Sequence, residues 1–393
     1  MPWNETCVMD LKIQLVADFL AGKYTVSELS RHYGISRKTV YKWLERYEAE
    51  GARGLSDRIR APKRRPHTTP EVIAERIIAT KRRHMSFGPK KVMDLLRREE
   101  PGTRWPADST AGDILKAAGL VRKRRFKRPY PADPQPFERG DRQNALWSAD
   151  YKGQYPSAGG HWCYPLTLTD NASRYLLGCQ GVTGTSYAQA RPVFEWVFSE
   201  YGLPEGILTD NGSPFASRSA GGLTRLSKWW VELGIRVHRM KPGTPTQNAR
   251  HERMHGSLNR AIGGQMQGAS LVEQHRLLQG FRSEFNEQRS HEALDRKTPA
   301  SVYRPSERAY SPVKKPVEYA ADQQVRCIRH NGEMKWRGSL HYVSELLARH
   351  RVGLREIEGD RLEVRYGLHL LGHLNLRTSQ MEPACHWHAG EEL

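Results

Sequence analysis

Strand and helix patterns follow one another in a fixed order from residue 145 onward, and this order constrains the fold more than any other feature. Three strand-like segments with alternating apolar and polar residues come first, at 145–155, 161–170 and 172–182. A helical pattern, a strand, a second helical pattern and a short strand then cover residues 186–240. Three strands in a row followed by strand–helix alternation predict a mixed sheet with helices on its faces. Two further helices are expected over 247–264 and 271–289.

The fourth strand ends in an acid and does not turn back on itself. Its sequence, ILTDNGSPF over residues 207–215, contains a signal typical of a tight hairpin, but no second alternating strand follows. We therefore expect the strand to stop at Asp210 to present a carboxylate, while Asn211 and Gly212 redirect the backbone. Asp170 lies in the same Thr-Asp-Asn triplet, but a strand-like run follows it, so we expect a structural role there.

Two more acids lie where a structural reason is hard to find. Asp150 interrupts the first strand, in WSADYKG, and Glu252 lies in the helix TQNARHERMHGSL. Helical spacing puts Glu252 on one face with Asn248, His255 and Asn259, so Glu252 is the acid expected to approach the sheet. Neighbouring carboxylates repel one another unless a cation lies between them, and hard oxygen ligands suit Mg²⁺. Two such ions about 4 Å apart can activate a hydroxyl and stabilise the leaving oxygen of a phosphodiester.

Three short helices are predicted over residues 11–50. Residues 25–28 have the form of a capping box, Gly34 provides a turn, and Ser36 can cap the third helix. Two short helices joined through a glycine turn are typical of a helix-turn-helix, whose second helix enters the major groove of DNA. The side chains then expected to face DNA are Arg37, Lys38, Thr39, Tyr41 and Lys42. The alternative is an ordinary three-helix core with a solvated basic face.

The patterns predict a multidomain α+β chain of seven segments. These are a helix-turn-helix domain (1–56), a basic Pro-rich linker (57–70), a second helical, helix-turn-helix-like DNA-binding unit (71–120), a basic linker (121–140), the mixed α/β core with a trailing helix (141–310), a small β-barrel (318–378) and a polar tail (379–393). The barrel prediction depends on hairpin signals at Asn331-Gly332 and Gly359-Asp360.

Positive charge is concentrated in the first part of the chain. Residues 1–140 carry 30 basic and 17 acidic side chains, a net +13, whereas the remainder carries +6. Such clustering suits a polyanion, with nucleic acid the first candidate, and both linkers are expected to lie along phosphates. Their basic residues are Arg58, Arg60, Lys63, Arg64, Arg65, Arg122, Lys123, Arg124, Arg125, Lys127 and Arg128. Solvated charge runs are the alternative.

Cysteine spacing and hydropathy bear on the compartment. The five cysteines never approach a CxxC spacing, which predicts neither a zinc site nor a disulfide framework and fits a reducing environment. No apolar run approaches the ~18 residues of a membrane span, and the first residues lack a signal-peptide pattern. We therefore expect a cytoplasmic protein without membrane contact, associated with the nucleoid when bound to DNA.

The ordered motifs resemble those of the DDE transposases of bacterial insertion sequences, in the group with a retroviral-integrase-like core. The resemblance is carried by the helix-turn-helix, the basic linker, WSADYKG, LTLTDNASRYLLG, GLPEGILTDNGSPF, KPGTPTQNARHERMHGSL and FRSEFNEQRSHEALDRKTPASVYRPSER. It implies an RNase H-like core in which Asp150, Asp210 and Glu252 are the catalytic and metal-binding triad for two Mg²⁺ or Mn²⁺ ions. The C-terminal barrel resembles the small SH3-like module that follows such cores.

The same resemblance implies a reaction and its partners. The chain would cleave at transposon ends and join the freed 3′-hydroxyl to target DNA, with terminal inverted repeats and target DNA as partners and at least a dimer in the synaptic complex. Asn211, Gln247, Asn248 and Arg253 are candidates for holding DNA near the metals. Alternatively, Asn211 only shapes its turn and Arg253 only pairs with Glu252. His255, on the Glu252 face, could assist the reaction, but we expect it instead to pack in the core or bind phosphate.

Two features depart from the family pattern. Between Asp210 and Glu252 lie 41 residues, more than usual, with FASRSAGGLTRL as the insertion, and Ala249 stands where glycine is usual. Neither departure removes a ligand. Three rival functions remain: a catalytically inert helix-turn-helix regulator, a plain RNase H-type nuclease, and an assembly subunit for another transposase. The intact triad disfavours the first, and the additional modules disfavour the second.

Overall fold

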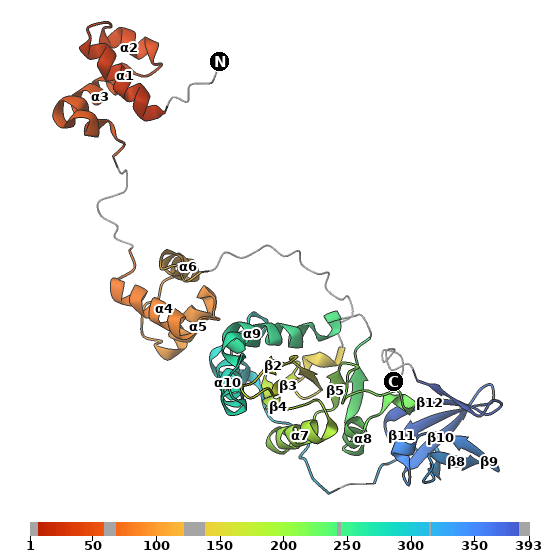
Figure 1. The fold of residues 1–393 in the computed structure, drawn as a ribbon. Helices are drawn as coiled ribbons and strands as arrows, with labels where there is room; N and C mark the ends of the chain where they lie inside the picture. The colour runs from red at the N-terminus through yellow and green to blue at the C-terminus, as the bar shows by residue number, and fades with distance from the viewer. Residues whose placement is uncertain (1–6, 59–67, 122–137, 242–244, 314–315, 385–393) are drawn as a thin grey trace. The chain divides into compact units, whose positions relative to one another are not determined.

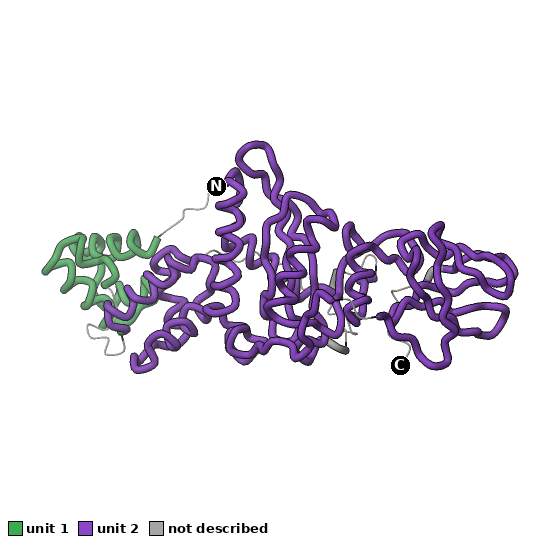
Figure 2. Tube along the Cα trace, turned by 90° about the horizontal axis from the view of Figure 1, so that it is seen from below, with its two compact units in different colours: residues 1–68 green, residues 69–393 purple. Residues whose placement is uncertain are grey.

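The computed structural model describes residues 7–58, 68–121, 138–241, 245–313 and 316–384. The chain forms two compact units, residues 1–68 and 69–393, which Figure 2 colours separately. Within the described residues, no helix combines the length and apolar character needed to cross a bilayer. The cysteines at positions 7, 163, 179 and 327 are free thiols.

The first unit is the predicted helix-turn-helix. Its elements are α1 (Val8–Leu20), α2 (Val26–His32), α3 (Arg37–Glu50) and the 3₁₀ turn η1 (Gly51–Leu55). Thr25 caps α2 through a capping box with Glu28, and the Ser36 side chain accepts a hydrogen bond from the Thr39 backbone N–H to cap α3. Leu29, Val40 and other apolar side chains close a small core between the helices. The predicted caps therefore start α2 and α3 at the expected places.

The second helical unit folds around its own core and also contacts the mixed α/β core. It consists of α4 (Glu71–Arg83), α5 (Pro89–Glu99) and α6 (Asp108–Ala117). The Arg296 guanidinium forms ion pairs with Asp94 of α5 at 2.5 Å and with Asp108 of α6 at 2.8 Å. His84 contacts Glu284 at 3.2 Å. Residues 69–120 are therefore held against the segment that follows the last long helix of the core.

The α/β core contains the predicted mixed sheet. Its strands are β1 (Leu146–Tyr151), β2 (Tyr155–Pro156), β3 (Trp162–Asp170), β4 (Leu176–Val182), β5 (Gly206–Thr209) and β6 (Arg236–Arg239). They run in the order β2-β3-β1-β5-β6, and β4 also pairs with β3. β1 is antiparallel to β3 and parallel to β5. The antiparallel start and parallel continuation are the arrangement expected from three consecutive strands followed by strand–helix alternation.

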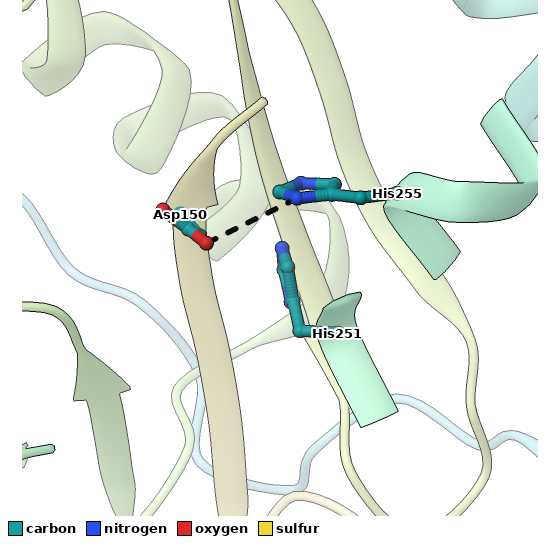
Figure 3. Close-up of side chains that lie close together, drawn as sticks. All are labelled: Asp150, His251 and His255. Carbon is teal, nitrogen blue, oxygen red and sulfur yellow. Dashed lines mark ion pairs between the residues drawn. The ribbon is translucent and has the colours of Figure 1, made fainter. Parts of the chain in front are cut away.

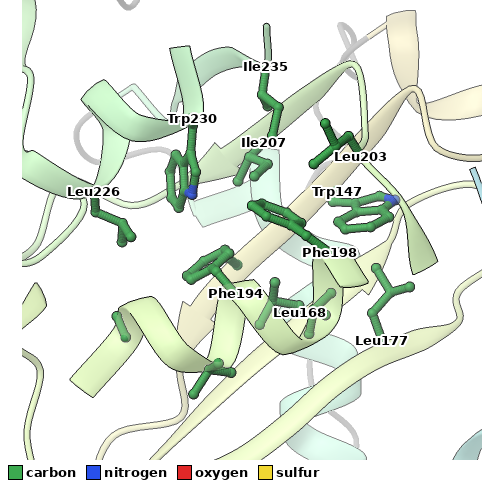
Figure 4. Packing of buried hydrophobic residues seen from close by; sticks show 14 of the residues in the cluster. Trp147, Leu168, Leu177, Phe194, Phe198, Leu203, Ile207, Leu226, Trp230 and Ile235 are labelled. Atoms are coloured by element: carbon green, nitrogen blue, oxygen red, sulfur yellow. The ribbon is translucent and has the colours of Figure 1, made fainter. Parts of the chain in front are cut away.

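Helices cover both faces of this sheet, as Figure 1 shows. α7 (Tyr187–Tyr201) and α8 (Arg225–Glu232) pack on one face, where Phe194, Phe198 and Trp230 meet Trp147 and Leu168 (Figure 4). α9 (Ala249–Met266) and α10 (Leu271–Ser283) share a second cluster with the other face. Because successive strand residues face opposite sides, Leu166 and Leu168 of β3 point to α7, and the intervening Thr167 points to α9.

The C-terminal region forms a five-stranded antiparallel sheet and a separate hairpin around one core. The sheet strands are β7 (Gln324–Cys327), β10 (Arg351–Ile357), β11 (Arg361–Tyr366), β12 (His369–Asn375) and β13 (Gln380–Pro383), and the hairpin strands are β8 (Glu333–Trp336) and β9 (Ser339–Tyr342). The predicted limit at 378 is wrong, because β13 lies in the segment assigned to the polar tail and pairs with β12.

One of the two predicted hairpin turns is confirmed and the other is wrong. β10 and β11 pair across the turn that contains Gly359 and Asp360. Asn331 does not join two paired strands, because the flanking strands β7 and β8 belong to different sheets. Its side-chain oxygen accepts a hydrogen bond from the Glu333 backbone N–H in a local turn. The hairpin turn lies six residues farther on, at Arg337 and Gly338, where Trp336 pairs with Ser339.

The insertion between the second and third acids docks the C-terminal sheet on the core. Leu223 and Val231 lie in the buried cluster of the C-terminal sheet rather than in that of the core. The Gly221 carbonyl lies 2.9 Å from His369 Nε2, within the 3₁₀ turn η3 (Ala220–Gly222). The insertion, which the sequence suggested only as extra length, therefore forms part of the contact surface for the C-terminal sheet.

Candidate active site

Two of the three predicted acids end neighbouring parallel strands. Ala149 of β1 is paired with Thr209 of β5, so the next residues, Asp150 and Asp210, follow at the same edge of the sheet. Parallel strands place their carboxyl ends together, and ligands commonly bind at such an edge. The parallel pairing therefore brings two acids together across 60 residues of sequence.

The chain after Asp210 turns away as expected. The Asp210 carboxylate accepts a hydrogen bond from the Gly212 backbone N–H at 3.1 Å. The Asn211 side-chain amide donates to the Met240 carbonyl at 2.8 Å, just beyond β6. In this structure Asn211 ties two loops together, which corresponds to the alternative reading of a residue that shapes its turn.

The buried face of α9 differs from the predicted one. His251, Met254 and His255 are buried against the sheet, whereas Glu252 is exposed. Glu252 nevertheless lies close enough to Asp150 for its charge to raise the pKa of that carboxyl. The helix therefore packs through its histidines and holds Glu252 at the edge of the packed face.

The electrostatics of Asp150 are those of a crowded acidic site. Burial raises the pKa of Asp150 from 3.8 to about 7, and the charges of Asp210 and Glu252 act in the same direction. Burial also raises the pKa of Asp210. Carboxylates that destabilise one another's charged form provide a favourable position for a divalent cation, which relieves the repulsion. By its donor chemistry, the group formed by Asp150, Asp210 and Glu252 fits a hard metal ion.

A second group beside Asp150 contains two buried histidines (Figure 3). Ligand atoms of Asp150, His251 and His255 lie within 4.8 Å of one another. Both ring nitrogens of His251 already contact hydroxyls, with Nε2 2.7 Å from Thr167 Oγ1 and Nδ1 2.9 Å from Thr169 Oγ1. His251 therefore has no free lone pair for a metal. This geometry favours a hydrogen-bonded support for α9 over a three-ligand metal site.

Asp170 has the structural role predicted for it. It is fully buried at the end of β3, opposite Trp147 rather than Asp150. Its carboxylate accepts hydrogen bonds from the Asn144 N–H at 2.9 Å and from the Ser173 N–H and hydroxyl at 2.8 and 2.5 Å. These bonds stabilise the turn between β3 and β4.

The predicted DNA-reading residues of the first unit lie mostly on an exposed surface of α3. Arg37, Lys38, Tyr41 and Lys42 are exposed. The Thr39 hydroxyl lies 2.9 Å from that of the Ser36 cap, so this side chain is engaged in capping the helix. Of the predicted linker residues, Arg58 forms an ion pair with Glu50. The other ten, Arg60, Lys63, Arg64, Arg65, Arg122, Lys123, Arg124, Arg125, Lys127 and Arg128, lie outside the described residues.

Three further candidates lie at the start of α9. Gln247 accepts a hydrogen bond from the Lys241 backbone N–H at 2.8 Å. Asn248 is 3 % exposed, and neither its Oδ1 nor its Nδ2 has a partner in the described part of the chain. Arg253 is exposed, and among the described residues it forms no ion pair with Glu252. An unpaired buried amide and an unpaired guanidinium beside the acids are groups that a ligand could satisfy.

Sequence reasoning missed two arginines in this region. Arg174 donates to the Asn171 carbonyl at 2.7 Å, and Arg250 donates to the same carbonyl at 3.1 Å. Burial lowers the pKa of Arg174 to about 10, and repulsion from Arg250 and Arg253 acts in the same direction. Three cations thus gather where the turn after β3 meets α9. No local spacing reveals this cluster, because the turn and the helix are distant in sequence.

Patterns of known protein families match several parts of the chain. Two family patterns described as "Integrase core domain" match residues 140–245 and 233–299. A "Helix-turn-helix domain" pattern matches residues 11–63, and a "Homeodomain-like domain" pattern matches residues 39–115.

Several curated proteins are similar over most of the chain. A 39.2 kDa protein of insertion element IS476 from Xanthomonas euvesicatoria is 27% identical, over 72% of this chain and 79% of that protein. A 31.7 kDa protein of insertion element IS407 from Burkholderia multivorans is 26% identical, over 63% of this chain and 86% of that protein. The transposase for transposon Tn552 of Staphylococcus aureus is 22% identical, over 65% of this chain and 56% of its own length.

Among solved structures, the catalytic core domain of HTLV-2 integrase in complex with magnesium aligns with 42% of this chain and 99% of its own length. The alignment has 16% identity and a TM-score of 0.32.

Proposed function

We propose that this chain, a DDE-type transposase of the bacterial insertion-sequence group with an integrase-like core, uses Asp150, Asp210 and Glu252 as its catalytic carboxylates. The observation that supports this proposal is that Asp150 and Asp210 lie at the same edge of two parallel strands, while the charge of Glu252 on α9 raises the pKa of Asp150.

The metal assignment follows from the chemistry of these donors. Catalysis by this class depends on divalent metal, and we assign two Mg²⁺ or Mn²⁺ ions to Asp150, Asp210 and Glu252. When bound, the ions would polarise the scissile phosphate and neutralise the charge that develops on its oxygens. The protein contributes three carboxylates, and burial together with the charges of Asp210 and Glu252 raises the pKa of Asp150 to about 7.

The reaction is a pair of phosphoryl transfers on DNA. Water would cleave one strand at each transposon end, and the freed 3′-hydroxyl would attack a target phosphodiester in line. Most of the rate enhancement then comes from positioning and charge neutralisation. We assign Asn248 and Arg253, together with Arg174, to holding the DNA backbone, because the buried Asn248 amide has no partner among the described residues and the Arg174 and Arg253 cations repel one another.

The helix-turn-helix and the basic linkers are the parts that we assign to DNA recognition. We assign recognition of the terminal inverted repeats to the exposed basic residues at the start of α3, because the second helix of a helix-turn-helix is the one that enters the major groove. The cationic linkers would add sequence-independent phosphate contacts. Pairing of two transposon ends requires at least two copies of the chain, which would act in the cytoplasm on chromosomal DNA.

The proposal is tested by end joining with purified protein. A labelled fragment that carries the inverted repeats flanking the gene is incubated with target plasmid and Mg²⁺ or Mn²⁺, and joined products are counted. Glu252→Gln should bind the fragment as well as wild type and yield no joined product. The matched control is Glu273→Gln, which changes a half-buried acid of α10 that pairs with Arg276. Joining by Glu252→Gln at the wild-type rate would exclude the assigned triad, and binding without joining by wild type would favour an inert regulator or a missing partner.

A further inference from the structure

The hydroxyl of Thr167 lies at the centre of the histidine group beside Asp150. Its oxygen lies 3.0 Å from the Asp150 carbonyl oxygen, 2.7 Å from His251 Nε2 and 2.8 Å from His255 Nε2. The hydroxyl has one proton to donate and two lone pairs that accept. A carbonyl can only accept, so all three contacts are satisfied when Thr167 donates to Asp150 and both imidazoles donate to Thr167.

This assignment determines the tautomer of each histidine. His251 carries its proton on Nε2, and its Nδ1 accepts from the Thr169 hydroxyl at 2.9 Å. His255 also carries its proton on Nε2, so its Nδ1 bears a lone pair. Both rings are almost completely buried, at 0 and 3 % exposure, which leaves little freedom for either ring to flip.

The lone pair of His255 faces a second acceptor. Nδ1 lies 4.0 Å from Asp150 Oδ2, which is too long for a hydrogen bond between them. Two acceptors at this separation match the spacing that one water bridges when it donates about 2.8 Å hydrogen bonds to both. A three-ligand metal site is excluded as the explanation, because both nitrogens of His251 are occupied.

We propose that His255, which Thr167 holds through Nε2, is a positioning residue whose Nδ1 orients a water molecule against Asp150 for the hydrolytic step. This inference rests on the proposed function. In that step the water oxygen bonds to phosphorus and the P–O3′ bond breaks. The water proton passes to solvent, and the leaving 3′-oxygen takes a proton from solvent. Joining uses a DNA hydroxyl in place of water, so it does not need the water that His255 orients.

The difference between water and DNA as nucleophile provides the test. Cleavage of an intact transposon end requires water, whereas joining of a pre-cut end with a free 3′-hydroxyl does not. His255→Gln keeps a donor near the Nε2 position and loses the acceptor. It should lower cleavage of intact ends about tenfold to a hundredfold, while joining of pre-cut ends changes less than about threefold.

Two further variants separate positioning from folding. His255→Asn keeps an acceptor near the Nδ1 position, and it should retain most of the cleavage that His255→Gln loses. Thr167→Val leaves His255 in place but removes the group that holds its tautomer, and it should lower cleavage selectively. Melting temperature and end-binding affinity are measured for each variant, and both should remain near the wild-type values in the His255 variants. Thr167→Val leaves two buried imidazole N–H groups without an acceptor and should lower the melting temperature, so its effect is judged by the ratio of cleavage to joining.

The outcomes are distinguishable from a failure of the proposed function. Wild-type protein that neither cleaves nor joins would remove the premise, and Glu252→Gln should abolish both reactions. If wild type is active and the His255 variants lose cleavage and joining equally, or lose neither, the inference about water is wrong. Selective loss of cleavage in His255→Gln and its recovery in His255→Asn would support it.

Discussion

At the scale of single residues, Asp150 combines burial with two like charges. Its carboxyl keeps a proton to higher pH than an ordinary aspartate because the charged form is poorly solvated and repelled by Asp210 and Glu252. An unfolded chain would release that proton near pH 4. The native state therefore binds more protons than the unfolded state between these limits.

This difference predicts how stability changes with pH. Without metal, the free energy of unfolding should fall as pH rises from about 4 to about 7, by up to about 4 kcal/mol from this group. Asp150→Asn should remove that part of the slope, whereas Asp113→Asn, which changes an exposed acid of α6, should not. Denaturant titrations across pH measure both.

Mg²⁺ should raise the melting temperature more at pH 8 than at pH 6, because it competes with the proton for Asp150. Equal effects at the two pH values would contradict the assignment of Asp150 as a metal ligand.

Asn248 and Asn286 are a matched pair for a second prediction. Both are buried, but Asn286 makes two hydrogen bonds to the Leu176 backbone, at 2.8 and 3.0 Å, whereas Asn248 makes none to the described residues. Asn286→Ala should cost about 2–4 kcal/mol of unfolding free energy. Asn248→Ala should cost less than about 1 kcal/mol and still lower end joining. A large loss of stability in Asn248→Ala would assign that side chain to the fold instead.

At the scale of elements, sequence patterns located the strands better than the faces of the helices. Alternation in β1 and β5, with an acid at each end, was enough to anticipate Asp150 and Asp210 as neighbours on a sheet. The buried face of α9 was missed because histidine looks polar in a pattern, and its burial depends on hydroxyls of β3, such as Thr167. That partner lies 84 and 88 residues from His251 and His255.

The prediction at the scale of elements concerns α3, the helix assigned to reading the DNA sequence. If α3 lies in the major groove, Arg37→Ala and Lys38→Ala should each weaken end binding. Each should also reduce the salt dependence of binding by about one ion equivalent for every phosphate that the native side chain neutralises. Lys23→Ala changes an exposed cation outside α3 and should have a smaller effect. Fluorescence anisotropy over a range of salt concentrations measures both quantities. Equal effects of all three substitutions would indicate nonspecific attraction instead of groove reading.

At the scale of the whole molecule, the insertion after Asp210 joins domains that sequence analysis treated as separate. Its contacts with β12 could not be foreseen, because the Gly221–His369 contact spans 148 residues and depends on a left-handed glycine. The same long range explains why the end of the C-terminal sheet was misplaced: β13 is recognisable only by its pairing with β12.

Substitution of Gly221 tests this docking. Its φ is +61°, and an added Cβ would meet His369 Nε2 at 2.9 Å and the Leu370 carbonyl oxygen at 3.0 Å. Gly221→Ala should destabilise the docked state by about 1–3 kcal/mol and expose the segment to limited proteolysis. Gly280→Ala, in open space on α10, should leave stability unchanged or raise it by up to about 1 kcal/mol. Similar protease resistance in both variants would show that the docking does not depend on Gly221.

The docked insertion has a thermodynamic consequence. One continuous stretch of chain leaves the sheet at Asp210 and enters the core of the C-terminal sheet at Leu223. If a ligand of that sheet moves this stretch, it changes the affinity of the acidic site by some factor. Reciprocity requires that occupation of the acidic site change the affinity for that ligand by the same factor. The insertion thus gives ligand binding at the C-terminal sheet and occupation of the acidic site a shared coupling free energy. This free energy can be measured as the change in affinity at either site.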